Sequence, residues 1–535
     1  MTAKSEATKP HWRQGNFWAL VALQLLLFFG SYRLFVVEND FLFLYHPDEP
    51  KKAFALTKDR LQFNHPLLMI QSSKVLYSKL DEKKQKNPQE AARCGRKVSA
   101  FYLSGAVAGL VLIAFWMGGW PGWWISAALL LSHPMLFEYA HYMKEDATFT
   151  FGLVAFCVGA GLFLRHPRAA TAVLMGVGAG LASSSKYVGV MCVIMALVIP
   201  FLLNWKGENK LAVRRRFVFC GLAIGAALLI FAVVNYPMIQ DMAKFSKDLD
   251  GELKTFETKS HILYFETPHL LVFEGLKKKL GILLSSLAIG GLLYGLIRDA
   301  RVRKAVLPLV MVAVSLAVIY CFSLYFWDRY LLPMVAFSLA LAGGVLGAAI
   351  LEGWKWRRPA GGVAGALAIA VLLLVVPPQL AGLRYNIECF RNDTRTAMYE
   401  FVKNEMEESA VIAQGKFSFL PYDQKRRRGH KRDPIPHTVI SRPQIEDFES
   451  IEELRRLGVT HVATGIVRGL DSSKKGSSSH GANVEWGNKR ERFYRDLLAN
   501  SHPIWESTGP YGCTVATPVE IRRLQPTAST KNNGE

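Results

Sequence analysis

The sequence predicts a polytopic α-helical membrane protein with about eleven transmembrane helices and a C-terminal extracytoplasmic α/β domain. Hydrophobic residues make up 51% of the 535 residues, and the mean hydropathy is +0.17. These residues gather in runs of roughly 20, the length that a helix needs to cross a hydrocarbon layer of about 30 Å. From residue 383 onward the chain is polar and alternates short segments typical of strands and helices. The high apolar content of the whole chain, with a net charge of +21, excludes an ordinary soluble enzyme.

The apolar runs are separated by polar loops, most of them short. The first run, FWALVALQLLLFFGSYRLFVV, is longer than the core of a signal peptide and lacks a small-residue cleavage site, so we expect a retained membrane anchor. The candidate spans are residues 16–37, 98–117, 120–137, 146–164, 170–185, 187–204, 216–236, 280–297, 304–326, 330–351 and 361–381.

Lys and Arg are concentrated in alternate loops, which predicts the orientation of the chain. If the N-terminus is cytoplasmic, most of these basic residues lie on the cytoplasmic side. They are Lys4, Lys9, Arg13, Arg165, Arg168 and those of the segments NWKGENKLAVRRR, RDARVRK and WKWRR. The short outer turns then hold only Lys144, Lys186 and Arg329. We therefore expect a multi-pass protein of the cytoplasmic (inner) membrane whose net charge of +21 reflects its topology, and we expect no nucleic-acid partner.

This orientation brings ionisable residues from distant parts of the chain to the outer membrane face. They are Asp48 and Glu49 in HPDE, Glu145 and Asp146 in YMKEDATFTF, Lys186 in SSSKYVGV and Arg329 in YFWDRYLLP. Each has a plainer interpretation by itself: a solvated helix start for the first acidic pair, a residue favoured by the helix dipole for Asp146, and snorkelling anchors for the cations. As a set they predict an active site at the membrane surface.

The chain divides into an expected transmembrane domain, residues 1–382, and an expected outer α/β domain, residues 383–535. The first outer loop, residues 38–97, has apolar residues at rough helical spacing interrupted by Pro66, which predicts two amphipathic helices at the membrane surface. In the outer domain AVIAQ predicts a strand. SIEELRRLGVTHVAT predicts a helix that is capped by Ser450 and ends at Gly458, followed by a strand.

The cysteines and glycines give no signature of a cofactor. The seven cysteines do not have the spacing of a metal site. Cys389 and Cys513 both fall in the outer domain, where oxidising conditions permit a disulfide. Two alternatives are open: the two cysteines pair, or both remain free. No phosphate-binding glycine loop and no dinucleotide fingerprint is present, so neither ATP nor NAD is expected.

Several motifs resemble, in their order and sidedness, those of membrane glycosyltransferases of the GT-C fold, the superfamily of protein O-mannosyltransferases and aminoarabinose transferases. HPDE is similar to the first-loop Asp-Glu motif, and FNHPLLM, with His65, to a Pro-containing segment of that loop. GVGAGLASSSKYVGV, with Lys186 and Tyr187, is similar to a Gly-rich span, and YFWDRYLLPMVAFSLAL, with Arg329 and Tyr330, to an Arg-Tyr-Leu-Leu-Pro element. NDTRTAMYEFV resembles the C-terminal part of bacterial members. The second acidic motif departs from the family pattern, because His141 and Lys144 stand where an Arg often precedes the Asp.

The resemblance implies an inverting glycosyltransferase that moves a hexosyl or pentosyl group from a polyprenyl-phosphate carrier to a hydroxyl or phosphate at the outer membrane face. Asp48 and Glu49 are the catalytic candidates, with Asp48 as the base, because a hydroxyl that attacks the anomeric carbon must lose its proton. A leaving phosphate needs cations. The substrate-binding candidates are Glu145, Asp146, Lys186, Tyr187, Arg329, Tyr330 and His65. The acceptor (a glycan, a lipid or a protein) and the use of a divalent metal are left open.

A transporter or flippase for a lipid-linked or anionic substrate is the alternative function. Transporters place their ionisable groups near the bilayer midplane, on broken helices and often in internal repeats. Here the spans are nearly free of central charge, the charged residues come at span ends, and no repeat is evident, which favours the enzyme. An inactive protein with the same fold is the third alternative.

Overall fold

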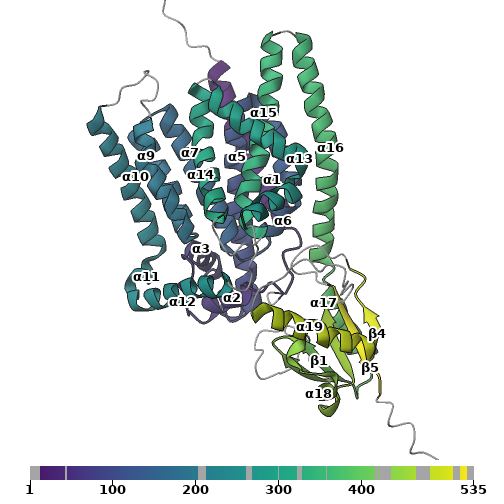
Figure 1. Cartoon of the computed structure of the whole chain (residues 1–535). Coiled ribbons are helices and arrows are strands. Elements are labelled where there is room, and N and C mark those ends of the chain that lie inside the picture. The colour runs from purple at the N-terminus through teal and green to yellow at the C-terminus, as the bar shows by residue number, and fades with distance from the viewer. Residues whose placement is uncertain are drawn as a thin grey trace, which may run out of the picture.

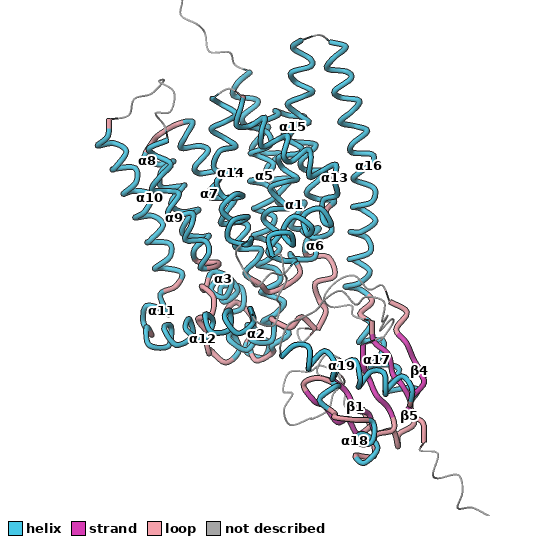
Figure 2. Tube along the Cα trace, viewed as in Figure 1, coloured by secondary structure: helices cyan, strands magenta, loops and turns pink. Residues whose placement is uncertain are grey.

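Long apolar helices lie side by side in a bundle, and a small unit of strands and helices is attached at one end of it (Figures 1 and 2). The structure is a computed structural model. It describes residues 12–42, 45–202, 212–260, 268–298, 300–321, 328–356, 358–415, 418, 420, 435–465, 482–509 and 518–526. Cys513 and its proposed pairing with Cys389 lie outside the described residues.

The bundle confirms the expected class of polytopic helical membrane protein. Its helices are α1 (Trp12–Phe35), α5 (Pro88–Ser132), α7 (Glu145–Arg165), α8 (Ala169–Ser183), α9 (Val190–Leu202), α10 (Val213–Val234), α13 (Pro268–Ile297), α14 (Ala300–Cys321), α15 (Leu332–Trp356) and α16 (Arg358–Arg391). Within the described ranges, eight helices are long and apolar enough to cross a membrane, and two shorter apolar helices lie at residues 169–183 and 187–202. The count of about eleven spans stays a prediction.

The helix α5 folds back on itself in its middle. Gly118 and Gly119 leave the helical conformation, and Gly119 has φ +57°, a backbone angle that residues with a Cβ rarely adopt. Gly122 then lies so close to the earlier part of α5 that a Cβ would be 2.7 Å from the Ala114 carbonyl oxygen. The two halves of α5 are therefore antiparallel neighbours, in agreement with separate predicted runs at 98–117 and 120–137.

Small residues let α15 pack closely against this turn. A Cβ on Gly347 would lie 2.2 Å from the Gly122 backbone nitrogen, and one on Gly343 would lie 2.6 Å from the backbone nitrogen of Ser126. In a membrane, where lipid tails are as apolar as Leu, such close backbone contact supplies much of the attraction between helices. It places α15 in the centre of the bundle, with its first half almost completely buried.

Short helices cover the end of the bundle that faces the small unit (Figure 1). They are α2 (Glu49–Thr57), α3 (Leu68–Tyr77), α4 (Glu82–Gln85), α6 (Pro134–Ala140), α11 (Tyr236–Gln240) and α12 (Met242–Ser260). Ala53 of α2 and Met69 and Ile70 of α3 pack on Val98 of α5 in a separate small core. Pro66 separates α2 from α3, as the sequence predicts.

In the C-terminal unit the described residues form a five-stranded sheet with helices on both faces. Its strands are β1 (Val411–Gly415), β2 (Thr438–Arg442), β3 (His461–Gly465), β4 (Ser501–Glu506) and β5 (Val519–Leu524), in the order β2-β1-β3-β5-β4. β1 pairs in parallel with β2 and β3, whereas β5 is antiparallel to β3 and β4. α17 (Thr394–Glu405) packs on the face that carries Ile412 and Ala463, and α18 (Ile451–Arg456) and α19 (Ala482–Ala499) pack on the opposite face.

The local signals predicted in this unit are confirmed. The Ser450 hydroxyl accepts a hydrogen bond from the Glu453 backbone N–H at 3.2 Å and so caps α18. Gly458 has φ +73° where that helix ends, and β3 follows. The boundary expected at residue 383 lies within α16, which runs on to Arg391 before α17 begins, so the division of the chain into domains stays a prediction.

We expect Gly347→Ala to destabilise the protein by about 1–3 kcal/mol, because its Cβ would strike the backbone of α5. Thermal unfolding of the detergent-purified variant measures this. The matched control is Gly221→Ala in α10, where a Cβ meets nothing within 4 Å. Equal melting temperatures for the two variants would contradict the close packing of α5 and α15.

Candidate active site

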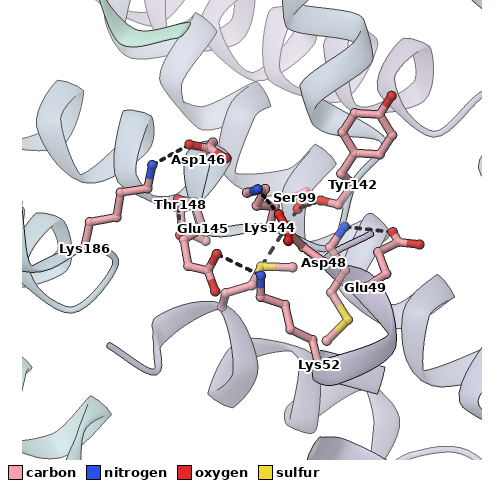
Figure 3. A network of polar contacts seen from close by, with 12 residues as sticks. Asp48, Glu49, Lys52, Ser99, Tyr142, Lys144, Glu145, Asp146, Thr148 and Lys186 are labelled. Carbon is pink, nitrogen blue, oxygen red and sulfur yellow. Dashed lines mark hydrogen bonds and ion pairs between the residues drawn. The ribbon is translucent and has the colours of Figure 1, made fainter. Parts of the chain in front are cut away.

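Charged side chains from four segments meet at one end of the bundle, and Figure 3 shows those of α2, α7 and the turn with Lys186. This end of the bundle carries the C-terminal unit (Figure 1). Asp48 is the N-cap residue of α2, and Glu145 and Asp146 form the first turn of α7. Lys186 precedes the short helix η1 (Tyr187–Gly189), and Arg329 lies in η2 (Asp328–Leu331). The two carboxylates of α7 are stabilised by the positive end of the helix dipole.

Asp48 is the most accessible carboxylate of the group, with 39% of its side chain exposed. Its Oδ2 atom accepts a hydrogen bond from the Lys144 ammonium group, which comes from the turn before α7. Arg329 Nη1 lies 3.5 Å from the same oxygen. Asp48 therefore has cations from two distant parts of the chain on one of its oxygens.

The two carboxylates of α7 are buried and each pairs with a lysine. Lys52 Nζ of α2 lies 2.9 Å from Glu145 Oε2, and Lys186 forms an ion pair with Asp146 Oδ1 (Figure 3). Together with the pairs of Asp48, and counting only the described residues that take part in these ion pairs, this makes four cations for three carboxylates. The cluster has an excess of one positive charge, which favours the binding of an anion.

The surrounding charges and burial shift the pKa values of Asp48 and Lys144. Burial alone would raise the pKa of Asp48, but Lys144, Lys52 and Arg329 outweigh it and hold the pKa of this carboxyl well below its usual value. Burial lowers the pKa of Lys144 to about 8, and the nearby charges of Arg329 and Lys52 act in the same direction against those of Asp146 and Asp48. Lys144 is thus protonated at neutral pH and loses its charge as the pH rises through about 8.

Glu49 occupies a different environment from Asp48, although the two are adjacent. It is fully buried and binds Arg96 through both oxygens, with Arg96 Nε at 2.8 Å from Oε1 and Nη2 at 2.5 Å from Oε2. Glu49 Oε1 also accepts the Met143 backbone N–H at 3.0 Å. Its carboxylate is therefore fully engaged and does not reach the accessible part of the cluster.

Arg96, also fully buried, extends this contact to the loop that follows α1. It donates to the carbonyl oxygens of Asn39 at 3.0 Å and Phe41 at 2.5 Å, and its guanidinium carbon lies 3.4 Å from the centroid of the Phe41 ring. The pair of Glu49 and Arg96 thus joins the loop that bears Asp48 to the turn that bears Lys144.

The aromatic candidates take two different positions. Tyr330 stacks on Tyr320, with ring centroids 5.6 Å apart, and the Lys186 ammonium lies 5.1 Å from the centre of the Tyr330 ring. Tyr187 instead donates its hydroxyl to the Phe63 carbonyl at 2.6 Å, which holds the loop that carries His65. Tyr330 is therefore part of the cluster, whereas Tyr187 supports a neighbouring loop.

His65 lies in an exposed position at the edge of the cluster. Its ring is close enough to Glu145, Lys52 and Lys186 to interact with their charges. The main chain of its loop is held on either side, because Asp248 accepts the Phe63 N–H at 2.9 Å and Asn235 Oδ1 accepts the Leu67 N–H at 2.8 Å. The loop is thus fixed from α12 and from the end of α10.

Three residues of the site have roles that the sequence did not suggest: Lys52, Lys144 and Arg96. Lys52 lies four residues after Asp48 at the start of α2, a spacing that places side chains on one helix face and that would have indicated it. Lys144 stood out only as an outer-turn cation. Nothing in the sequence distinguishes Arg96 from the other basic residues of its loop.

Lysines pair with the carboxylates of the cluster. Among the described residues no three His, Cys, Asp or Glu side chains gather to hold an ion. Asp48, Glu145 and Asp146 each form an ion pair with a lysine ammonium group.

We expect Arg96→Met and Glu49→Gln each to destabilise the protein by about 3–5 kcal/mol, because each leaves the other charge buried without its partner. The double variant should lose much less than the sum of the two, since no lone charge remains. Melting temperatures in detergent measure this. Arg93→Met, one turn earlier and partly exposed, is the control and should cost at most about 1 kcal/mol. Additive losses would contradict a coupled pair.

No protein-family model matches the sequence, and no curated protein matches it. Similar solved structures include ArnT from Cupriavidus metallidurans bound to undecaprenyl phosphate, with 15% identity and a TM-score of 0.48 over 95% of this chain and 98% of that one. The archaeal oligosaccharyltransferase AglB from Archaeoglobus fulgidus, in complex with an inhibitory peptide and a dolichol-phosphate, has 11% identity and a TM-score of 0.46 over 83% of this chain and 69% of that one. The arabinofuranosyltransferase AftD from Mycobacteria has 12% identity and a TM-score of 0.44 over 95% of this chain and 40% of that one. Identities and TM-scores this low carry no argument, so we argue the function from the geometry of the site.

Proposed function

We propose that this protein is an inverting glycosyltransferase that moves a sugar from a polyprenyl-phosphate carrier to an acceptor hydroxyl at the extracytoplasmic membrane face. One observation carries the proposal. An accessible carboxylate, Asp48, lies within one cluster with an excess of positive charge at the end of a helical bundle. Such a cluster offers a base for the acceptor and cations for a phosphate in the same place.

The proposed reaction forms one bond and breaks another at the anomeric carbon. The acceptor oxygen attacks this carbon from the face opposite the phosphate, the bond between the carbon and the phosphate oxygen breaks, and the acceptor proton passes to Asp48. Polyprenyl phosphate leaves with the bonding electrons. A single displacement of this kind inverts the anomeric configuration. It needs one accessible carboxylate, which agrees with the burial of Glu49.

Cations stabilise the charge that develops on the leaving phosphate. Arg329 and Lys186 both lie beside Tyr330, and Arg329 can donate two parallel hydrogen bonds to phosphate oxygens. In a site with little water such donors contribute strongly to transition-state stabilisation. Glu145 and Asp146 hold Lys52 and Lys186 in position, and Glu49 acts through Arg96 and the Met143 backbone to position the cluster.

The expected location supports an enzyme that uses a lipid-linked donor. The cluster lies at the same end of the bundle as the C-terminal unit (Figure 1). The positive-inside pattern of the sequence predicts that this end faces away from the cytoplasm. The charged groups meet at the helix ends, whereas the alternative of a transporter would favour groups near the middle of the membrane.

We expect Asp48→Asn to bind donor but to transfer sugar at least about 10²-fold more slowly, because the amide keeps the shape of the side chain and lacks its basicity. The test purifies the protein with native lipid, identifies the co-purifying polyprenyl-phosphate sugar by mass spectrometry and follows its consumption in membranes. Asp59→Asn, an exposed carboxylate just after α2, is the control. Near wild-type transfer by Asp48→Asn would exclude Asp48 as the base.

Arg329→Met and Lys186→Met should each reduce kcat/KM for the lipid-linked donor by about 10- to 10³-fold, since each removes a cation from the leaving phosphate. Steady-state kinetics with the purified donor measure this loss. Lys58→Met, exposed at the end of α2, should leave the kinetics unchanged and serves as the control. If both site variants turn over donor at the control rate, the two residues are interfacial anchors and the assignment fails.

A further inference from the structure

The structure shows Asp48 in a form that is poorly suited to accept a proton. One of its oxygens binds the Lys144 ammonium and lies 3.5 Å from Arg329, so its negative charge is largely neutralised. The same cations hold the pKa of Asp48 well below its usual value. A base with so low a proton affinity takes a proton from a hydroxyl inefficiently. A change in its surroundings is required before it can act.

We propose that Lys144 is shared between Asp48 and the donor phosphate: it masks the Asp48 carboxylate while no donor is bound, and it turns to the phosphate when the donor arrives. This inference rests on the proposed function, because it takes a phosphate-bearing lipid as the ligand. It gives Lys144 a catalytic role that couples departure of the phosphate to proton transfer from the acceptor to Asp48.

The backbone around Lys144 is fixed, so that its side chain alone can make this change. The Met143 N–H donates to Glu49, and the Tyr142 carbonyl accepts hydrogen bonds from Ser99 Oγ at 2.5 Å and from the Lys144 N–H at 2.8 Å (Figure 3). The side chain is a flexible four-carbon stem with a compact charge, which can turn between neighbouring anions. Glu49 is fully engaged with Arg96, so it offers Lys144 no alternative partner.

The electrostatic surroundings favour a second anion beside Lys144. Four groups surround Asp48. They are Lys144 in the turn before α7, Lys52 of α2, Arg329 of η2 and the His46 ring of the loop that also carries Asp48. Lys144 itself faces Asp48, Asp146, Lys52 and Arg329. Two of these four neighbours of Lys144 are cations, which repel it. A phosphate that enters among the three cations relieves this repulsion and competes with Asp48 for Lys144.

Sharing Lys144 links departure of the phosphate to activation of the base. As the bond between the anomeric carbon and the phosphate oxygen breaks, the phosphate gains a negative charge and attracts Lys144 more strongly. Asp48 loses its cation at the same time, and its proton affinity rises as the acceptor hydroxyl gives up its proton. The acceptor proton ends on Asp48, and polyprenyl phosphate leaves paired with Lys144. Without donor the base stays masked, so the donor must bind before the acceptor is activated.

The test measures protonation of Asp48 through its reaction with a water-soluble carbodiimide at pH 5, quantified by peptide mass spectrometry. We expect undecaprenyl phosphate to raise labelling of Asp48 in the wild-type protein at least about tenfold, because one pKa unit changes the protonated fraction tenfold in this range. Undecaprenol, which lacks the phosphate, should leave it unchanged. Lys144→Met should show the raised labelling without any lipid, and Lys51→Met, an exposed lysine of α2, should behave as wild type.

A second measurement uses the pH dependence of lipid binding. Lys144 is charged below about pH 8 and neutral above it, so affinity for undecaprenyl phosphate should fall as the pH rises through this value. Lys144→Arg keeps its charge and should retain its affinity above this pH. This readout does not depend on turnover and separates a charge role from a purely structural one.

The outcomes distinguish failure of this inference from failure of the proposed function. Equal increases of Asp48 labelling by undecaprenyl phosphate in the wild type and in Lys144→Met would mean that the phosphate charge acts directly, which overturns the sharing of Lys144. Parallel loss of affinity above pH 8 in the wild type and Lys144→Arg would do the same. If undecaprenyl phosphate does not bind at all and no lipid-linked sugar is consumed, it is the proposed function that fails.

Discussion

The arrangement of the site depends on one buried ion pair, between Glu49 and Arg96. Removing two full charges from water is expensive, and the cost is offset only where the geometry is good and the remaining donors and acceptors are satisfied. Both conditions hold here, because Arg96 binds the two oxygens of Glu49 and two carbonyl oxygens of the loop after α1, and Glu49 also accepts the Met143 N–H. The pair thereby fixes three segments that are far apart in the sequence. Asp48 and Lys144 flank it directly, so their contact follows from it.

A second constraint is the balance of charge at the end of the bundle. The carboxylates of α7 lie at its N-terminus, where the helix dipole favours them, yet burial would make them costly without the lysines that pair with them. One cation beyond the number of carboxylates leaves the cluster attractive to an anion. The same excess suppresses the basicity of Asp48, so attraction of a phosphate and activation of the base become parts of one electrostatic balance.

The C-terminal unit is connected to this region through the loop before Asp48. Arg395 of α17 is almost fully buried, and its guanidinium carbon lies 4.2 Å from the centroid of the Tyr45 ring, three residues before Asp48. A cavity of about 270 Å³ lies close by, between the end of α1 and the junction of α16 and α17. The position of the unit beside the site is therefore tied to the same loop as the candidate base.

The sequence by itself determined the class of the protein, the course of most helices, the caps of α18 and the set of ionisable residues at one end. These follow from local signals: apolar runs of membrane length, alternate loops rich in Lys and Arg, and turn residues at helix ends. Only the tertiary structure decided which carboxylate is accessible. Asp48 and Glu49 are adjacent and chemically alike, but side chains of neighbouring residues point in different directions, so Glu49 meets Arg96, 47 positions away, and Asp48 meets Lys144 and Arg329. Such pairings depend on how distant helices pack, which no local pattern encodes.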